Sequence, residues 1–329
     1  MPRPPSGDGP GSAPIGMPPR RTLLRAGAWT GLTAALAAGV SGCGIRLEDD
    51  APTIPFLART PVPDEALLVA AYRRAAGLAE KATQAAGVAG AAQVTQRHTG
   101  QAHVLRAILD AGAVPERIIS GATSPTATSS GPKQPGPTAV SAAELGQAVA
   151  ITARESLTAA GLFMAHRALG ASVAAHDAAS QIGLGGAPAW PARDPLPAGV
   201  AAGLLTVTRA CAYAVQVAAA HLSGAERTAL MVLIDVLGAR EEALLVAVTP
   251  PPPPTLGYRL PFPVTGAVEA RRLITVALGN LVDRGLDRLE DIPPATSPLV
   301  EVVRLQAEAV TLASAHGVPW PTMPGLRVG

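Results

Sequence analysis

The sequence has 329 residues, of which 48% are apolar, only 3% are aromatic and 15% are charged. The formal net charge is +2, yet residues 43–329 hold 22 basic and 23 acidic side chains, because four arginines lie before them. Balanced charge and few aromatic residues argue against nucleic-acid binding. Ala, Leu and Val dominate, and long runs that alternate β-branched with polar residues are missing, which favours an all-α fold.

The first 42 residues are typical of an export signal. Arg20 and Arg21 are followed by Thr-Leu-Leu-Arg, which resembles a twin-arginine motif, and residues 26–42 then carry no charge. This run is shorter than the about 20 residues of a spanning helix. It ends in Val-Ser-Gly before Cys43, which resembles a bacterial lipobox. We therefore expect a signal peptide over 1–42 and a lipid on Cys43, which would place the exported protein on the outer face of the cytoplasmic membrane.

A Pro-rich tether over 43–63 precedes the first helical patterns. Residues 64–87 begin with acids and end with Gly, as a helix prefers, and residues 92–112 form a second helical pattern. These two predict an antiparallel helix pair. The Ser/Thr/Pro/Gly-rich stretch over 121–137 cannot bury much surface, so we expect a disordered loop there.

A long apolar stretch from Ser141 to residue 182 begins with Ser-Ala-Ala-Glu. Ser141 and Glu144 have the spacing of a capping box. One unbroken helix of this length would reach about 60 Å, far longer than its neighbours. We therefore expect a break near Gly161.

The region after the 183–199 linker repeats the helical pattern. Helices are expected at 200–222, 223–248, 263–289 and 297–316. The second of these begins with Ser223 and Glu226, which have the spacing of a capping box. Four helices on each side of the linker predict two four-helix units, over 64–182 and 200–327. The alternative is one continuous array of eight helices.

A family resemblance rests on the segment Tyr-Arg-Leu-Pro-Phe-Pro-Val-Thr at 258–265, followed by an amphipathic helix, a further helix and Pro-Thr-Met-Pro-Gly-Leu. Together with Ala218–Leu230, this resembles an uncharacterised ferritin-like family of exported actinobacterial proteins. The stronger similarity covers about 200–327, and a weaker one runs through 62–182. The resemblance implies ferritin-like four-helix bundles.

The ferritin-like resemblance raises the question of a di-iron centre. Such a centre takes a Glu from each of two helices and a Glu-x-x-His from each of the other two. No Asp or Glu in 43–329 stands three residues before a His, and Val173 occupies that place before His176. Relatives carry an acid–His pair where this chain has Thr208 and Arg209. The sequence therefore predicts no intact di-iron site and no bound cofactor.

A non-standard metal site remains an alternative. Its candidate ligands for Fe, Mn, Zn or Cu are Glu80, His98, His103, Glu155, His166 and His176. His98 and His103 are about 140° apart around a helix, so only one can point inward. Asp177 is not expected to form a dyad with His176, because adjacent helical residues point apart.

The leading interpretation is an exported, lipid-anchored helical protein with a binding or scaffolding role at the cell envelope rather than an enzyme. Its partners would be the membrane, through Cys43, and an envelope protein. The alternatives are a metal-binding protein or metal-dependent oxidoreductase, and a carrier of an apolar ligand. Cys211 is expected to be a small buried apolar residue.

Overall fold

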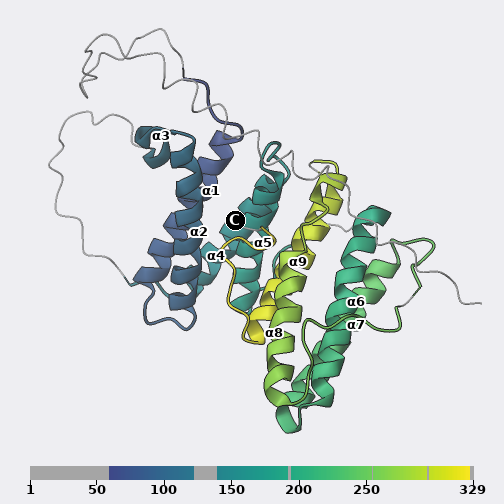
Figure 1. Cartoon of the computed structure of the whole chain (residues 1–329). Coiled ribbons are helices and arrows are strands. Elements are labelled where there is room, and N and C mark those ends of the chain that lie inside the picture. The colour runs from purple at the N-terminus through teal and green to yellow at the C-terminus, as the bar shows by residue number, and fades with distance from the viewer. Residues whose placement is uncertain (1–58, 122–138, 192–193, 254, 295, 327–329) are drawn as a thin grey trace, which may run out of the picture. The chain divides into compact units, whose positions relative to one another are not determined.

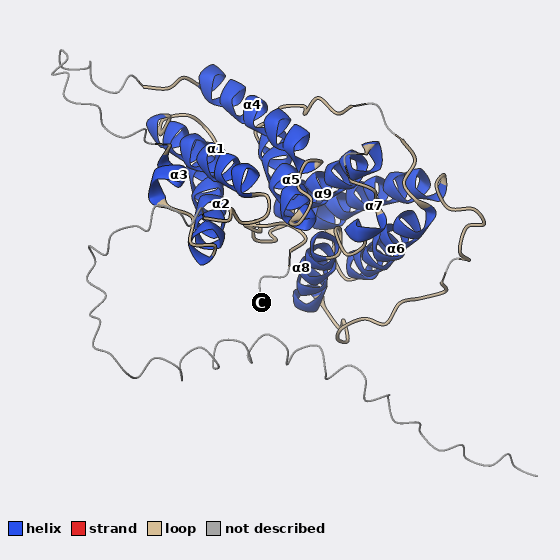
Figure 2. Cartoon of the chain, turned by 90° about the horizontal axis from the view of Figure 1, so that it is seen from above, coloured by secondary structure: helices blue, strands red, loops and turns tan. Residues whose placement is uncertain are grey.

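The regular elements of the protein are helices throughout the described residues. The computed structural model describes residues 59–121, 139–191, 194–253, 255–294 and 296–326. In these ranges the all-α expectation is confirmed (Figure 2). The helices are α1 (Glu65–Gln84), α2 (Ala91–Ala111), α3 (Glu116–Ser120), α4 (Ala142–Ala160), α5 (Arg167–Gly183), α6 (Ala198–Ala220), α7 (Gly224–Leu245), α8 (Ala267–Asp283), the 3₁₀ helix η2 (Leu289–Asp291) and α9 (Ser297–Ala315).

Several sequence expectations fall outside the described residues. These are the signal over 1–42 with Arg20 and Arg21, the lipid site at Cys43, most of the 43–63 tether, and nearly all of the loop over 121–137.

The N-terminal helix group consists of α1, α2, α4 and α5. Helix α1 packs along α2 and also contacts α4, which in turn packs along α5 (Figure 1). Leu68, Leu105 and Val173 share one buried apolar cluster that joins α1, α2 and α5. The four helices therefore enclose a common interior, in which α2 faces α5.

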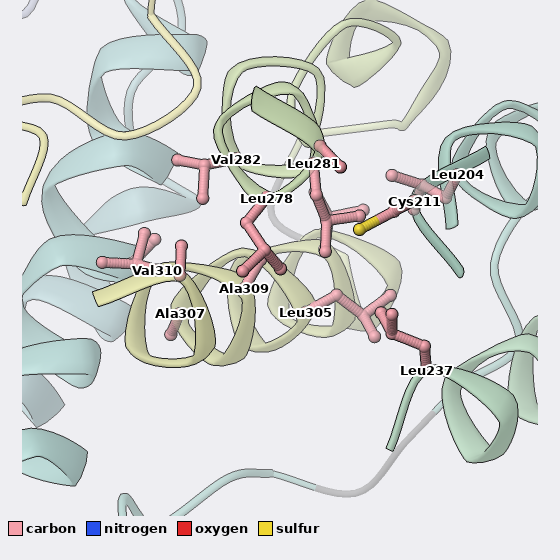
Figure 3. Close-up of a cluster of buried hydrophobic side chains, with 14 of the residues drawn as sticks. Leu204, Cys211, Leu237, Leu278, Leu281, Val282, Leu305, Ala307, Ala309 and Val310 are labelled. Carbon is pink, nitrogen blue, oxygen red and sulfur yellow. The ribbon is translucent and has the colours of Figure 1, made fainter. Parts of the chain in front are cut away.

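The C-terminal helix group consists of α6, α7, α8 and α9. Helix α6 packs against both α7 and α8, and α8 packs against α9. Figure 3 shows the core, in which the sulfur of Cys211 lies among leucine side chains such as Leu237 and Leu281. Cys211 is buried, as expected for a small apolar residue, and burial raises the pKa of its thiol to about 12.

Helix α5 connects the two groups by packing against α9. Its alanines, such as Ala171 and Ala175, belong to the same buried cluster as the leucines of α6 to α9. The small side chains on this face of α5 let the two helices approach closely. The division of the chain into units at 64–182 and 200–327 stays a prediction.

The helix boundaries confirm some of the expected signals and correct others. Helix α4 ends at Ala160, so the break near Gly161 is confirmed, and the Ser141–Glu144 capping box is present. The second capping box is wrong, because the side chain of Ser223 makes no capping bond and Glu226 pairs instead with Arg271 at 2.7 Å. The short α3 was not expected from the sequence.

Among the described residues, α6 is the one helix that is long and apolar enough to cross a membrane by length and composition alone. This is weak evidence for a membrane span, since core helices pass the same test. Val200, Leu205 and Val215 of α6 are buried against its neighbours, which is the behaviour of a core helix.

Candidate metal centre

A polar cluster lies inside the otherwise apolar N-terminal helix group. His98 comes from α2, and His176 and Asp177 come from α5; we call these three residues the His–His–Asp cluster. The two imidazoles are fully buried and Asp177 is 2% exposed. Helix α4 adds Ser156, which is also buried. Buried polar groups of this kind are costly unless they are paired or bind an ion, so their concentration here needs a chemical reason.

The geometry of the cluster centres on one carboxylate oxygen. Oδ1 of Asp177 lies 3.4 Å from Nδ1 of His176 and 3.6 Å from Nδ1 of His98. The other oxygen, Oδ2, accepts a hydrogen bond of 2.6 Å from the hydroxyl of Ser156. One donor atom from each of the three cluster residues lies within 4.8 Å of the other two.

The electrostatics of the cluster favour a neutral His98 beside an ionised Asp177. Burial lowers the pKa of His98 to about 4, although the Asp177 carboxylate opposes this shift. Burial acts to raise the pKa of Asp177, but the hydrogen bond with His176, the nearby imidazoles and the bond from Ser156 bring it below its ordinary value. Carboxylate and neutral imidazole are the protonation states in which these side chains bind metal ions.

Several buried polar atoms around the cluster lack a hydrogen-bond partner within the described residues. They include Nε2 of both His98 and His176, Nε2 of Gln101 and the hydroxyls of Ser172 and Ser180. Gln101 does contact the cluster, with its Oε1 at 3.1 Å from Nδ1 of His98. Leaving a buried donor or acceptor unpaired costs about 1–3 kcal/mol, so this polar interior is costly to bury.

Aromatic and cationic side chains close one side of the cluster. The ring of His98 meets that of His176 edge-on at 5.0 Å between centroids, and Trp320 meets His176 in the same manner at 5.9 Å. The guanidinium of Arg97 lies 3.4 Å from the centre of the Trp320 ring. The segment after α9 therefore covers the cluster through Trp320.

The donor atoms suit a borderline transition-metal ion. Neighbouring ligands of a tetrahedral zinc site lie about 3.3 Å apart when the metal–ligand bonds are about 2.0–2.1 Å, close to the two Nδ1–Oδ1 separations. Imidazole favours Zn, Cu, Fe or Ni, whereas Mg²⁺ and Ca²⁺ need more oxygen ligands. Gln101 or a water molecule could supply a fourth ligand, and Ser156 would orient the carboxylate.

The structure brings together only two of the metal ligands suggested by the sequence, His98 and His176. Glu80, Glu155 and His103 are exposed. His166 instead lies beside Asp64, with 3.3 Å between Nδ1 and the carboxylate.

The expectation that Asp177 forms no dyad with His176 was wrong. Its carboxylate and Nδ1 of His176 approach each other although the residues are adjacent on one helix.

The interior of the C-terminal helix group contains arginine side chains where the N-terminal group has the His–His–Asp cluster. Thr208 is buried, and Arg209 pairs with Glu241 at 2.7 Å. The guanidinium of Arg240 donates to the carbonyl of Leu305 at 2.8 Å. Buried arginine side chains repel cations, so the described residues of this group hold no counterpart of the His–His–Asp cluster.

Comparison with known proteins adds no relative: no family model, curated protein or solved structure matches the chain. The resemblance to a ferritin-like family therefore stays a prediction.

Proposed function

We propose that the protein binds one transition-metal ion at the His–His–Asp cluster, and that it does so as an exported protein anchored to the membrane through Cys43. The observation that carries the metal proposal is the approach of two buried Nδ1 atoms to a single buried carboxylate oxygen, at 3.4 and 3.6 Å. Zn²⁺ is the reference ion, because it accepts mixed nitrogen and oxygen ligands without demanding one geometry.

A hydrogen-bond network without metal is the competing explanation. In that case His176 donates to Asp177 and His98 donates to Gln101 through their Nδ1 atoms. The two Nε2 atoms do not separate the explanations, because an ion at the Nδ1 atoms would leave them unpaired as well. A bound divalent ion would instead balance the charge of Asp177. The scaffolding role inferred from the sequence corresponds to this metal-free network.

The deciding experiment measures metal content of the full-length chain purified without chelator. We expect about one equivalent of metal, or binding of about one Zn²⁺ or Co²⁺ per chain after chelator treatment. His98→Ala should abolish this binding. His103→Ala is the matched control, because His103 lies exposed on the same helix, and it should bind normally.

Two further measurements decide between the explanations if His98→Ala does not fold. Asp177→Asn preserves the shape of the side chain and should weaken metal binding strongly. The visible spectrum of the Co²⁺-loaded wild type should show tetrahedral or five-coordinate nitrogen and oxygen ligation. Wild type that neither retains metal nor gains thermal stability with Zn²⁺ or Co²⁺ would leave only the metal-free network.

The apolar-ligand alternative would use the hollow of about 340 Å³ beside α4 and α9, which is lined mostly by apolar side chains such as Leu157, Leu299 and Val303. A larger hollow of about 590 Å³ lies between α6, η2 and α9, but charged side chains such as Arg284, Arg288 and Glu290 line it. An apolar ligand favours walls of hydrophobic and aromatic side chains.

A further inference from the structure

Helix α7 carries apolar side chains on two faces, and only one of these faces is covered. Its buried residues are four leucines, at positions 230, 233, 237 and 244, which point into the C-terminal helix group. On another face Val232 is 60% and Val236 46% exposed, and Val246, directly after the helix, is 82% exposed. The second apolar face is open to solvent although the first already packs in the core, so the second face is suited to a partner.

The exposed face has the spacing of a helix–helix interface. It consists of Ala225, Ala229, Val232, Val236, Ala239, Ala243 and Val246, which alternate at intervals of four and three residues, and we call it the α7 seam. All seven residues are exposed. A repeat of alternating fours and threes along a helix is the pattern by which two helices pack on each other. Ala and Val also allow the backbones to approach closely.

We propose that the α7 seam binds a second copy of itself in antiparallel orientation. When the two helices are aligned so that Val236 faces Ala239 of the other copy, Val232 faces Ala243 and Ala229 faces Val246. Each of these three layers then combines one Val with one Ala, and the twofold axis repeats each pair. Parallel alignment would instead stack Val on Val and Ala on Ala, which leaves alternating wide and narrow layers. Uniform layers pack with fewer voids.

The charges beside the seam favour a protein partner over a lipid surface. Asp235 and Glu242 line one edge of the seam, and the basic Arg240 of the other edge is turned inward to the carbonyl of Leu305. Helices that lie on anionic membranes carry Lys and Arg on the polar face and Trp, Phe or Leu on the apolar face. The α7 seam has neither feature.

The size of the seam predicts a weak dimer. Its 22 residues, 225–246, span about 32 Å, and a helix is about 10 Å wide, so the seam covers about 320 Å² on each copy. Stable complexes bury about 800 Å² on each partner. In the antiparallel alignment Asp235 also lies near Glu242 of the other copy. Added salt should therefore strengthen the dimer, because it screens this repulsion.

Disulfide cross-linking of the full-length chain tests the proposal directly. In a Cys43→Ala background, Val236→Cys and Ala239→Cys chains are mixed and oxidised with diamide. The mixture should cross-link faster than either variant alone, and more so at higher salt. Cys211 is buried and should not react. Val268→Cys is the matched control, since Val268 is an exposed valine on α8.

Matched lysine variants complete the experiment. Val232→Lys should slow cross-linking between positions 236 and 239 by about tenfold, whereas Val268→Lys should leave it unchanged. Equal cross-linking at the seam and at position 268, or no effect of Val232→Lys, would overturn the proposal. So would a Val232→Lys variant that loses binding to phosphatidylglycerol vesicles without any change in cross-linking, because the seam would then be a membrane surface.

Discussion

Asp64 connects the beginning of α1 to the beginning of α5. Its carboxylate accepts hydrogen bonds from the backbone N–H groups of Met164, Ala165 and His166 at 3.2, 2.9 and 2.8 Å. Burial acts to raise the pKa of Asp64, but these bonds outweigh it and lower the pKa below its ordinary value. The backbone of Asp64 has a φ of 56°, a left-handed conformation that Asn also tolerates.

Replacing Asp64 by Asn should therefore remove the charge with little change in backbone strain. We expect a loss of about 1 kcal/mol in the free energy of unfolding at neutral pH, as for a lost helix cap. Because the folded pKa is depressed, this stabilisation is present above the unfolded value of about 3.9 and disappears as pH falls through the folded value. Urea unfolding of wild type and variant should differ at pH 7 and converge in acid; Asp110→Asn, an exposed carboxylate on α2, is the control.

His98 should make the metal-free protein sensitive to mild acid. Its pKa is about 4 in the folded chain, whereas an unfolded histidine titrates near 6.5. Between these values the unfolded chain binds the extra proton, so the free energy of unfolding should fall as pH drops from about 6.5 towards 4, by on the order of 3 kcal/mol.

This slope should be measured in chelator by urea titration at several pH values. His98→Gln should flatten it and His103→Gln should not. If the free energy of unfolding of all three proteins depends on pH in the same way, burial of His98 does not cause the loss of stability in acid.

The sequence could predict one part of the candidate site from local geometry alone. The angle between His98 and His103 on a helix correctly indicated that one histidine points inward. The same reasoning failed for Asp177, because side-chain torsions let its short carboxylate bend towards Nδ1 of the preceding residue. No spacing rule joins His98 to Asp177, since they lie on different helices and meet only in the folded interior. Ser156 and Trp320 carried no sequence signal of a role here.

At the scale of the helices, two serines offer a matched comparison of capping. Ser141 and Glu144 form both bonds of a capping box, with 2.8 Å from the Ser141 N–H to the carboxylate. Ser223 makes no such bond. Ser141→Ala should therefore lower the free energy of unfolding by about 1 kcal/mol, and Ser223→Ala by clearly less, in urea titrations. Equal losses would contradict the assignment of the two caps.

Tertiary contacts explain which helix signals failed. Glu226 leaves its predicted partner because Arg271 of α8 binds it with two hydrogen bonds, at 2.7 and 3.0 Å. The short α3 ends where Arg73 of α1 donates to the carbonyls of Ile118 and Ile119. Both arginines are distant in sequence, so neither local pattern could reveal them. The break after Ala160 was predictable because it follows from helix length alone.

At the scale of the whole molecule, lipid attachment to Cys43 is the proposal that determines where the protein acts. Labelled palmitate should be incorporated into wild type in the native host and lost in Cys43→Ala. Cys211→Ala is the control, because Cys211 is buried and has a raised pKa. Equal labelling of Cys43→Ala and wild type would show that the anchor lies elsewhere.

The helical class of the described residues was predictable because it follows from composition. Ala, Leu and Val supply helix propensity and narrow apolar faces, and no strand pattern competes with them. The arrangement of the helices was less accessible. Helix α5 packs both on α4 and, through its small residues, on α9, and Ala-rich helices give little sign of which face meets which partner.

The position of Trp320 gives the molecule an optical reporter. Its indole lies 5.9 Å from His176, with Arg97 against its face. Trp190, the other tryptophan of the described residues, lines a hollow beside α4 and α5. Indole fluorescence is quenched by open-shell ions at such short range. Filling the His–His–Asp cluster with Cu²⁺ or Co²⁺ should therefore dim the emission of Trp320, so that fluorescence reports occupancy of the site without any added label.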